Sequence, residues 1–236
     1  MSEPILALTD VHTYIGQHHI LQGVSFAVNP DRVTVLLGRN GAGKSTTLRT
    51  IIGLLPPSSG RIELGGQSIG GLPPYRIARS GVGFVPEDQA VIYNLTVGEN
   101  FRLAMLHEDQ GAWDRLETVF ELFPDLKRFW SRKAGLLSGG QKQMLAIARV
   151  FVNDHRLLLI DEPSKGLAPR IVEHLGESLN HIKKTTTIIL VEQNFYLASM
   201  VGEDYCILDD GRLVHNGLMS DLVGDDELKT KYLGIA

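Results

Sequence analysis

The 236-residue sequence predicts an α/β fold, in which helices cover both faces of a mostly parallel sheet. Three continuous apolar runs carry this prediction, because parallel strands are buried on both faces and are apolar throughout. The runs are VTVLL at 33–37, RLLLI at 156–160 and TTTIILV at 185–191. Segments with helix-spaced apolar residues separate them, which favours alternating strands and helices.

The first part of the chain is predicted to be rich in strands. Residues 1–37 contain three strand-like runs, and turn residues at 29–31 interrupt them. A short helix is expected after residue 44, and it ends at Pro56. The elements expected next are a strand at 60–69, a brief helix at 73–81 and a strand at 82–87.

The middle of the chain is predicted to be helical from about Thr96 to Val152, with an interruption at Pro124. Its aromatic residues Trp113, Phe120 and Phe123 are expected to form the core of this helical piece rather than a ligand-binding box. The last part returns to alternation. Its expected elements are helices at 170–184 and 194–202, strands within 204–217, and a short surface helix in the tail from 225.

The composition is that of an ordinary globular protein, with 43% hydrophobic and 21% charged residues. A formal net charge of −4 offers no basic footprint for nucleic acid. Cys206 is the only cysteine, which excludes an internal disulfide and a cysteine-based zinc site, and its apolar neighbours predict a buried thiol. Since we find neither a signal-peptide pattern nor an apolar run approaching ~20 residues, we expect a cytosolic protein that reaches a membrane only through a partner.

The segment GRNGAGKST at 38–46 matches a phosphate-binding loop, and it lies between a predicted strand and a predicted helix, as such a loop requires. Its glycines let successive backbone N–H groups turn inward around phosphate oxygens. Lys44 supplies a positive charge for the β and γ phosphates, and Ser45 supplies a hydroxyl for Mg²⁺. The nucleotide-binding residues expected in this loop are Gly38, Arg39, Asn40, Gly41, Ala42, Gly43, Lys44, Ser45 and Thr46.

Two acids, Asp161 and Glu162, follow the apolar run at 156–160. A buried strand that ends there delivers both carboxylates to the carboxyl edge of the sheet, where the phosphate loop also lies. We predict that Asp161 holds the metal through its hydration shell, and that Glu162 orients or deprotonates an attacking water.

A second segment that could bind an anion begins at LSGGQ, residues 137–141. Ser138 can cap a helix whose glycines allow close approach, so that backbone N–H groups and the helix dipole face an anion. One nucleotide in the first loop leaves little room for a second cradle from the same molecule. We therefore predict that two chains related by a two-fold axis exchange these residues, and that each contacts the ATP held by the other. The residues expected to act across this interface are Ser138, Gly139, Gly140 and Gln141.

In their order, GRNGAGKST, LSGGQ, and LLLIDEP followed by SKGLAP resemble the ATPase subunit of an ATP-binding cassette transporter over essentially the whole chain. The resemblance implies an α/β P-loop NTPase (RecA-like) core with an N-terminal antiparallel β subdomain and an inserted α-helical subdomain at about 90–150, in one domain spanning 1–236. It implies ATP hydrolysis with Mg²⁺ in a head-to-tail dimer. The absence of an N-K-x-D element excludes a P-loop GTPase, and simple kinases lack the LSGGQ signature.

Finer segments, among them VPEDQAVIYNLTVGEN, DEPSKGLAP and LVEQN, resemble ATPases of bacterial importers for branched-chain (hydrophobic) amino acids. Urea and short-amide importers are the nearest alternative, and a soluble cassette ATPase that does not transport is the other. The branch implies a second ATPase, identical or paralogous, two transmembrane permease subunits, and an external substrate-binding protein. It also implies a peripheral place at the cytoplasmic face of the cell membrane and no nucleic-acid partner.

Several positions depart from the general cassette pattern. Glu87 stands where a metal-contacting glutamine is usual, so the expected metal set is Ser45, Glu87 and Asp161. Gln193 replaces the histidine that contacts the γ phosphate, so the expected catalytic set is Lys44, Glu162 and Gln193. Ala168 replaces an aspartate.

Strict register places Ile15 in the adenine-stacking position, but we prefer Tyr14 because a phenol ring stacks better on a base. His18 and His19 are expected to be solvated and to share no metal, because neighbouring residues of a strand point to opposite faces. The apolar residues Val91, Ile92, Tyr93 and Leu95 lie in a connector. They predict either a docking groove for a partner helix or burial under the helical piece.

Overall fold

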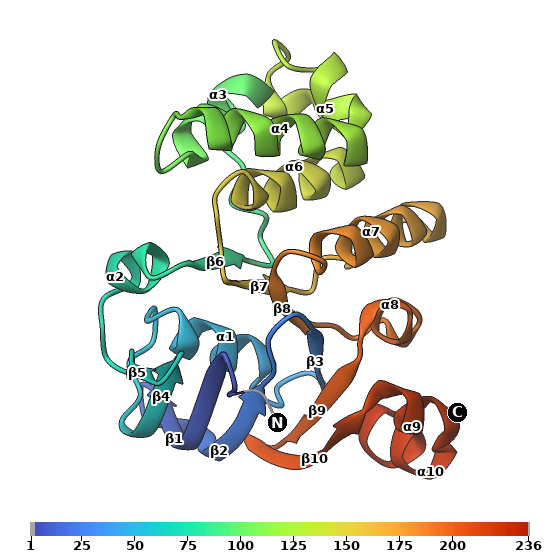
Figure 1. Ribbon diagram of the computed structural model, residues 1–236. Helices are drawn as coiled ribbons and strands as arrows, with labels where there is room; N and C mark the ends of the chain where they lie inside the picture. The colour runs from blue at the N-terminus through green and yellow to red at the C-terminus, as the bar shows by residue number, and fades with distance from the viewer. Residues whose placement is uncertain (1–2, 236) are drawn as a thin grey trace.

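The computed structural model describes residues 3–235, which form two sheets and a group of helices (Figure 1). The strands are β1 Leu6–Ile15, β2 His18–Val28, β3 Val33–Leu37, β4 Ser59–Leu64, β5 Gln67–Ser68, β6 Val82–Val85, β7 Leu157–Asp161, β8 Thr187–Val191, β9 Asp204–Asp209 and β10 Arg212–Leu218. The α-helices are α1 Lys44–Ile51, α2 Pro74–Arg79, α3 Val97–Ala104, α4 Gln110–Leu122, α5 Pro124–Arg128, α6 Gly139–Phe151, α7 Pro169–Ile182, α8 Phe195–Val201, α9 Met219–Gly224 and α10 Asp226–Leu228.

The larger sheet has the strand order β10-β9-β3-β8-β7-β6, and all of its neighbouring pairs are parallel except β10 with β9. The apolar runs at 33–37 and 185–191 form β3 and β8, and RLLLI leads into β7. Their side chains alternate between two cores, because successive residues of a strand point to opposite faces. Val35 faces the core that contains the helices α3–α9, whereas Leu36 faces the core that contains α1. The predicted α/β core is confirmed.

The smaller sheet is antiparallel, with the order β2-β1-β4-β5, as expected for the N-terminal part of the chain. Helix α1 lies between the two sheets (Figure 1). Thr13 of β1 and Thr50 of α1 share a buried hydrogen bond of 3.2 Å. A backbone hydrogen bond of 2.8 Å from Gln22 to Gly211 joins the sheets at their margins. Thr50 lies in the last turn of α1, so its contact with Thr13 holds the end of the helix against the antiparallel sheet.

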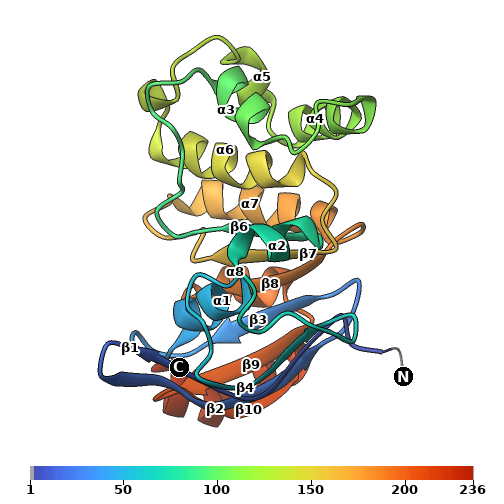
Figure 2. The same ribbon diagram turned by 90° about the vertical axis from the view of Figure 1, so that its left-hand side faces the viewer.

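Helices α3, α4, α5 and α6 occupy the end of the molecule opposite the antiparallel sheet (Figure 2). Phe101, Phe120 and Trp130 pack against one another there, with ring centroids 5.7 to 6.3 Å apart. Phe123 is buried and Trp113 is half-buried against the same core, so the predicted structural role of these aromatics is confirmed. A separate subdomain at about 90–150 stays a prediction, and its helices lie between β6 and β7 in the chain.

The C-terminal tail forms a short helical segment at the surface, as predicted, and part of it is a π-helix. It forms α10 and then a π-helical stretch at Lys229–Leu233. Leu228, Tyr232 and Leu233 are only half-exposed, because they pack against the main core. Cys206 is buried as predicted, and burial raises the pKa of its thiol to about 12.

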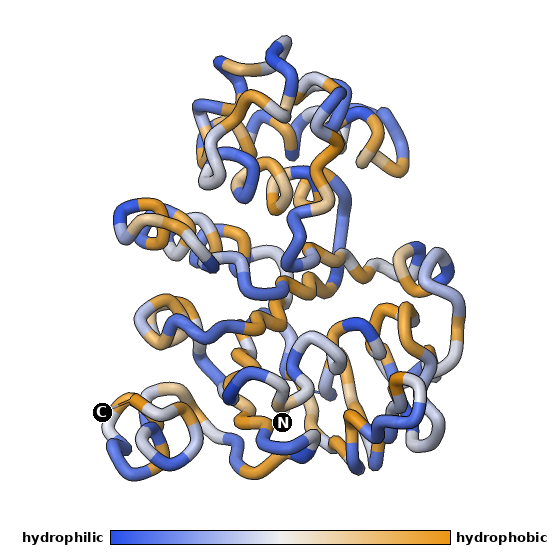
Figure 3. The backbone as a smooth tube through the Cα atoms, turned by 180° about the vertical axis from the view of Figure 1, so that it is seen from behind, coloured by the Kyte–Doolittle hydropathy of each residue, from blue (hydrophilic) through white to orange (hydrophobic). Residues whose placement is uncertain are grey.

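Hydrophobic and hydrophilic stretches alternate around the helical coils (Figure 3). This is the pattern of helices that cover a buried sheet with one face and meet water with the other. No helix within residues 3–235 combines the length and the apolar character needed to span a bilayer.

Candidate functional site

The phosphate loop connects β3 to α1 with a backbone that requires glycine. Gly38 has φ +142°, and a Cβ there would lie 2.2 Å from the carbonyl oxygen of Leu208. Gly43 has φ +100° directly before the helix. Because other residues rarely adopt these angles, the glycines allow the loop to turn its N–H groups inward.

The side chain of Lys44 closes this loop from within. Its Nζ donates to the carbonyl oxygens of Gly38 and Arg39 at 2.9 and 3.1 Å. The side chain is 4% exposed, and burial lowers the pKa of its ammonium, while the charge of Glu162 opposes that shift. A buried ammonium held by the carbonyls of a loop that turns its N–H groups inward is a site prepared for phosphate oxygens.

A cleft of about 350 Å³ opens beside the loop. Its lining residues are Ile20, Asn40, Gly41, Gly43, Lys44, Ser45, Thr46, Glu87, Glu162, Lys165 and Gln193. Nine of these are predicted site residues, and Ile20 and Lys165 are not. Of the other predicted loop residues, Gly38 and Arg39 supply the carbonyls that hold Lys44, and Ala42 is buried in the core.

Asp161 and Ser45 meet across 116 positions of sequence. The Oγ of Ser45 donates to Oδ1 of Asp161 at 2.8 Å, and Oδ2 of Asp161 is buried with no hydrogen-bond partner among the described residues. Burial raises the pKa of Asp161, and the Ser45 hydrogen bond opposes that shift. An unpaired carboxylate oxygen beside a hydroxyl fits Mg²⁺, which binds through one or two carboxylates together with phosphate and water oxygens.

Glu162 has an uncommon backbone. Its φ is +45°, in the left-handed region that costs a residue with a Cβ about 1–2 kcal/mol. Its N–H donates to the carbonyl of Val191 at 2.9 Å, and its side chain is 9% exposed. Nε2 of Gln193 donates to Oε1 of Glu162 at 2.5 Å. The strained turn and the amide together hold this carboxylate in the wall of the cleft.

Glu192 is a site residue that the sequence analysis missed. Its carboxylate accepts hydrogen bonds from the N–H and hydroxyl of Ser164, both at 2.9 Å, and from the N–H groups of Gln193 and Asn194, both at 3.1 Å. Burial raises its pKa, and the backbone donors oppose the shift. Glu192 thus ties the loop after β7 to the loop after β8, and the available signal was an acid ending the apolar run TTTIILV.

Glu87 lies in the cleft wall, but its carboxylate is engaged. Oε1 of Glu87 accepts from Nζ of Lys165 at 2.5 Å. Of the predicted metal set, the structure therefore brings Ser45 and Asp161 into contact and places Glu87 in the same cleft with a different partner.

The LSGGQ segment begins α6 with a capping box. Oγ of Ser138 accepts from the N–H of Gln141, and Oε1 of Gln141 accepts from the N–H of Ser138. Nε2 of Gln141 also donates to Asp125 at 2.9 Å. Ser138 and Gly139 are exposed, and none of residues 138–141 lines the phosphate cleft of its own chain. Their contact with a second chain's nucleotide stays a prediction.

Tyr14 and Ile15 are both about half exposed, and neither lines the phosphate cleft. The ring of Tyr14 stacks on His19, with centroids 4.2 Å apart and planes 5° from parallel. Ile15 instead lines a separate cavity that also contains Arg49 and Glu87. The choice between Tyr14 and Ile15 for adenine stacking stays open to test.

The expectation of solvated histidines is correct for His18 and wrong for His19. His18 is exposed, whereas His19 is half-buried and its Nε2 lies 3.0 Å from Nδ1 of His12. The cause is the β1–β2 pairing, which brings His12 and Tyr14 to the same face as His19. No group of three or more His, Cys, Asp or Glu side chains within residues 3–235 is placed to hold a metal by itself.

The connector after β6 contains both buried and exposed apolar side chains. Val91 is buried and Leu95 is half-buried, whereas Ile92 is 39% and Tyr93 is 53% exposed. A separate cavity of about 440 Å³ is lined by residues of α2, β6 and α6 and by the exposed side chains of Leu54 and Tyr75, and no connector residue lines it. The burial expectation therefore holds for Val91, and the surface expectation holds for Ile92 and Tyr93.

Comparison with known proteins gives a consistent result. The family model described as "ABC transporter" matches residues 21–165. The chain is 37% identical to the high-affinity branched-chain amino acid transport ATP-binding protein BraG of Pseudomonas aeruginosa, over 98% of this chain and 100% of that protein. It is 36% identical to the probable branched-chain amino acid transport ATP-binding protein LivF of Archaeoglobus fulgidus, over 92% and 93%. The structure of MJ1267 in its ADP conformation, an ATP-binding cassette of an ABC transporter, superposes with a TM-score of 0.85 at 23% identity, over 96% of this chain and 97% of that one.

Proposed function

Because the chain belongs to the ABC transporter family of ATP-binding proteins, we propose that it is the ATPase subunit of a bacterial importer for branched-chain amino acids. As a member of the family it is an ATPase. The observation that supports the assignment is the cleft lined by the phosphate loop and Glu162, with Asp161 bound to Ser45 directly behind it. The names of the two relatives support the choice of substrate class.

ATP is the substrate that the cleft fits. The loop amides and Lys44 bind the β and γ phosphates, and the cleft extends from them to Ile20, which offers an apolar surface near the nucleotide. Ser45 and Asp161 would hold Mg²⁺, with Glu87 as the third predicted ligand. Bound Mg²⁺ neutralises phosphate charge during the transfer.

Glu162 acts as the general base for the attacking water in this proposal. A carboxylate in this place must point at the water rather than swing freely, because proton transfer requires hydrogen-bond reach. The left-handed backbone at Glu162 and the amide of Gln193 provide that restraint. Lys44, whose Nζ lies 4.0 Å from Oε1 of Glu162, brings the phosphate end of the substrate next to the base.

The proposed importer function implies several protein partners. A second ATPase, identical or paralogous, would place its residues 138–141 over the nucleotide, and two permease subunits would dock on the exposed connector. The exposed apolar side chains of Ile92 and Tyr93 support such a docking surface for a short partner helix. The protein would then sit peripherally at the cytoplasmic face of the membrane, with an external binding protein as an indirect partner.

Glutamate substitutions at Ile92 and Tyr93 are expected to abolish uptake while leaving the ATPase activity of the isolated subunit within about twofold of the parent. Both side chains lie on the surface, so added charges oppose docking more than folding. The measurement is uptake of radiolabelled leucine, isoleucine and valine by cells that express each form with its permease and binding proteins. Val223→Glu, at an exposed apolar side chain of α9 outside the connector, is the matched control.

The same uptake experiment separates the candidate functions. Uptake of urea in place of the amino acids would contradict the branched-chain assignment and favour the urea and short-amide importers. Co-purification of RNA, with no permease bound, would favour a soluble cassette ATPase. Unfolding of the Ile92→Glu form, seen as a lost thermal transition, would show that the connector is a core segment and not a docking surface.

Gln193→Ala is expected to slow hydrolysis about tenfold and to leave most nucleotide affinity intact. The amide restrains Glu162, whereas Lys44 and the loop amides bind the phosphates. Gln193→His is expected to restore activity and to add a pH dependence between about 6 and 7.5, because imidazole titrates there and an amide does not. Steady-state ATPase rates of the three forms across that range provide the measurement, and an alanine form as fast as the parent would remove Gln193 from the catalytic set.

A further inference from the structure

Lys165 joins two carboxylates that lie on different segments of the cleft. Its Nζ donates to Oε1 of Glu87 at 2.5 Å and lies 3.9 Å from Oε2 of Glu162. Glu87 follows β6 and Glu162 follows β7, and these strands are parallel neighbours in the sheet. One ammonium therefore bridges the carboxyl ends of two adjacent strands at the point where the cleft opens.

The loop that carries Lys165 is fixed by other contacts. Ser164 is buried and is held by two hydrogen bonds to Glu192. The N–H of Lys165 donates to the carbonyl of Glu162 at 3.3 Å. The backbone of Lys165 is thus anchored, and its side chain, which is 64% exposed, reaches across the cleft mouth from a defined origin.

The electrostatic setting explains why a cation lies there. Glu162 and Glu87 line the cleft, Asp161 is buried behind Ser45, and the charges of Glu162 and Glu87 both act to raise the pKa of Asp161. Lys44 does not form an ion pair with Glu87, because its ammonium donates hydrogen bonds to the carbonyls of Gly38 and Arg39. The hydrogen bond with Glu87 is the main cause that raises the pKa of Lys165. Lys165 is the cation that neutralises Glu87 in this structure.

We propose that Lys165 is a positioning residue that holds Glu87 beside Glu162 in the nucleotide-free state and competes with the divalent cation for the carboxylate of Glu87. The inference rests on the proposed function, since it requires nucleotide and metal in the cleft. Loading the site then transfers Glu87 from Lys165 to the metal and frees the ammonium to face the phosphates. In that exchange the carboxylate of Glu87 changes partner, and the segment after β6, which leads to the proposed docking connector, shifts with it.

Lys165→Met tests the proposal, because it removes the charge and keeps most of the side-chain length. Two affinities of the isolated chain are expected to move in opposite directions. Mn²⁺, used in place of Mg²⁺ and followed by electron paramagnetic resonance with adenylyl imidodiphosphate bound, should bind about two- to fivefold more tightly, the range expected for an exposed ion pair. A fluorescent ATP analogue in EDTA should bind more weakly by a similar factor, because a cation has left the phosphate cleft.

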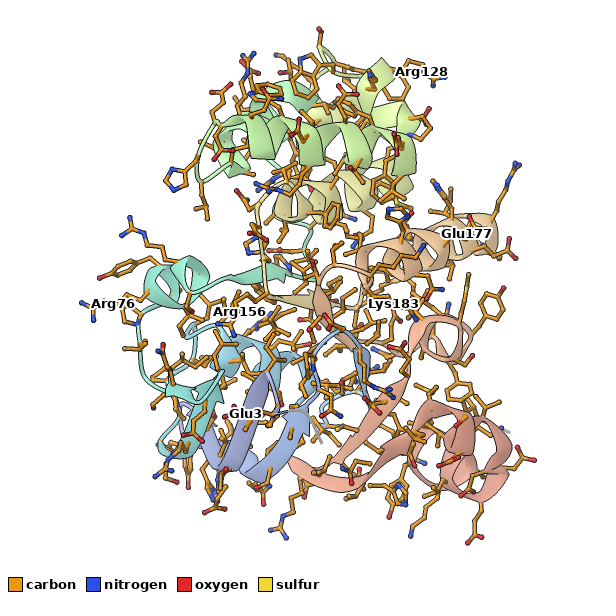
Figure 4. The ribbon with its side chains drawn as sticks, viewed as in Figure 1. Glu3, Arg76, Arg128, Arg156, Glu177 and Lys183 are labelled. Atoms are coloured by element: carbon orange, nitrogen blue, oxygen red, sulfur yellow. The ribbon has the colours of Figure 1, made fainter. Side chains whose placement is uncertain are left out.

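Three further variants isolate the cause. Lys165→Arg keeps the charge and should retain both parental affinities. Lys183→Met removes a comparable ion pair with Glu203 at the far end of α7 (Figure 4) and should change neither affinity. In Glu87→Gln, the added Lys165→Met change should no longer tighten Mn²⁺ binding, since the two residues then have no ion pair to break.

Unchanged Mn²⁺ affinity in Lys165→Met, or tightening that persists in the Glu87→Gln background, would overturn the competition. A general loss of structure would weaken both ligands together and would also overturn it. These affinity measurements do not depend on transport. If amino acid uptake fails while the Mn²⁺ affinities shift as expected, only the importer assignment is contradicted. Failure of the parent chain to bind the ATP analogue would count against the proposed function itself.

Discussion

Replacing Glu162 with glutamine is expected to reduce the rate of ATP turnover by a factor of about 10² to 10⁴, the usual contribution of a positioned general base. The amide has the shape of the carboxylate and can still meet Gln193, but it cannot accept a proton from water. The contacts that bind phosphate come from Lys44 and the loop, so ATP should remain bound. An ATP-bound dimer should therefore accumulate, either of this chain or with its paralogous partner.

The measurements are steady-state ATPase activity and size-exclusion chromatography with light scattering in the presence of ATP. Glu177→Gln, at an exposed site on α7 (Figure 4), is the matched control and should keep the parental rate. An unchanged rate in Glu162→Gln would remove the base assignment. A lost thermal transition would show that the strained backbone at 162 requires the native carboxylate for folding.

Lys44→Ala is expected to weaken ATP binding roughly ten- to a hundredfold, because charge-assisted hydrogen bonds to phosphate are the strongest contacts in the cleft. In the free protein the ammonium also holds the carbonyls of Gly38 and Arg39, so its removal loosens the loop that presents the amides. Isothermal titration calorimetry with ATP in the presence of Mg²⁺ provides the measurement.

Lys127→Ala is the control for this change, because Lys127 is an exposed lysine on α5 that pairs with Glu117 and lies outside the cleft. The two cleft variants should differ in kind. Glu162→Gln keeps affinity and loses turnover, whereas Lys44→Ala loses affinity first. Equal ATP affinity in Lys44→Ala and the parent would mean that the loop amides alone bind the phosphates.

The amino-acid order alone was enough to place the phosphate loop, the strand that ends at Asp161, and the start of α6. Each depends on a local pattern: glycines at positive φ, an apolar run buried on both faces, and a serine three residues before a glutamine. The meeting of Ser45 and Asp161 could also be predicted, since the carboxyl ends of parallel strands share one edge of a sheet.

Local patterns do not report which side chain reaches which. Lys165 pairs with Glu87 across 78 positions, and Glu192 caps a loop 28 positions away. Gln141, expected to face a second chain's nucleotide, also binds Asp125 of α5 across 16 positions. These contacts depend on how separate elements pack, and no periodicity within one segment encodes that packing.

The same limit explains the first hairpin. A bulge between Thr13 and Tyr14 shifts the pairing of β1 and β2, so that Tyr14 lies opposite His19 and stacks on it. Because side chains alternate with a period of two, one extra residue in a strand changes which of them share a face. Sequence order determines the chemistry that each segment carries, and only the register of the folded sheets decides that His19 meets Tyr14 and that Lys165 meets Glu87, because those pairs are set by how each strand aligns with its neighbour.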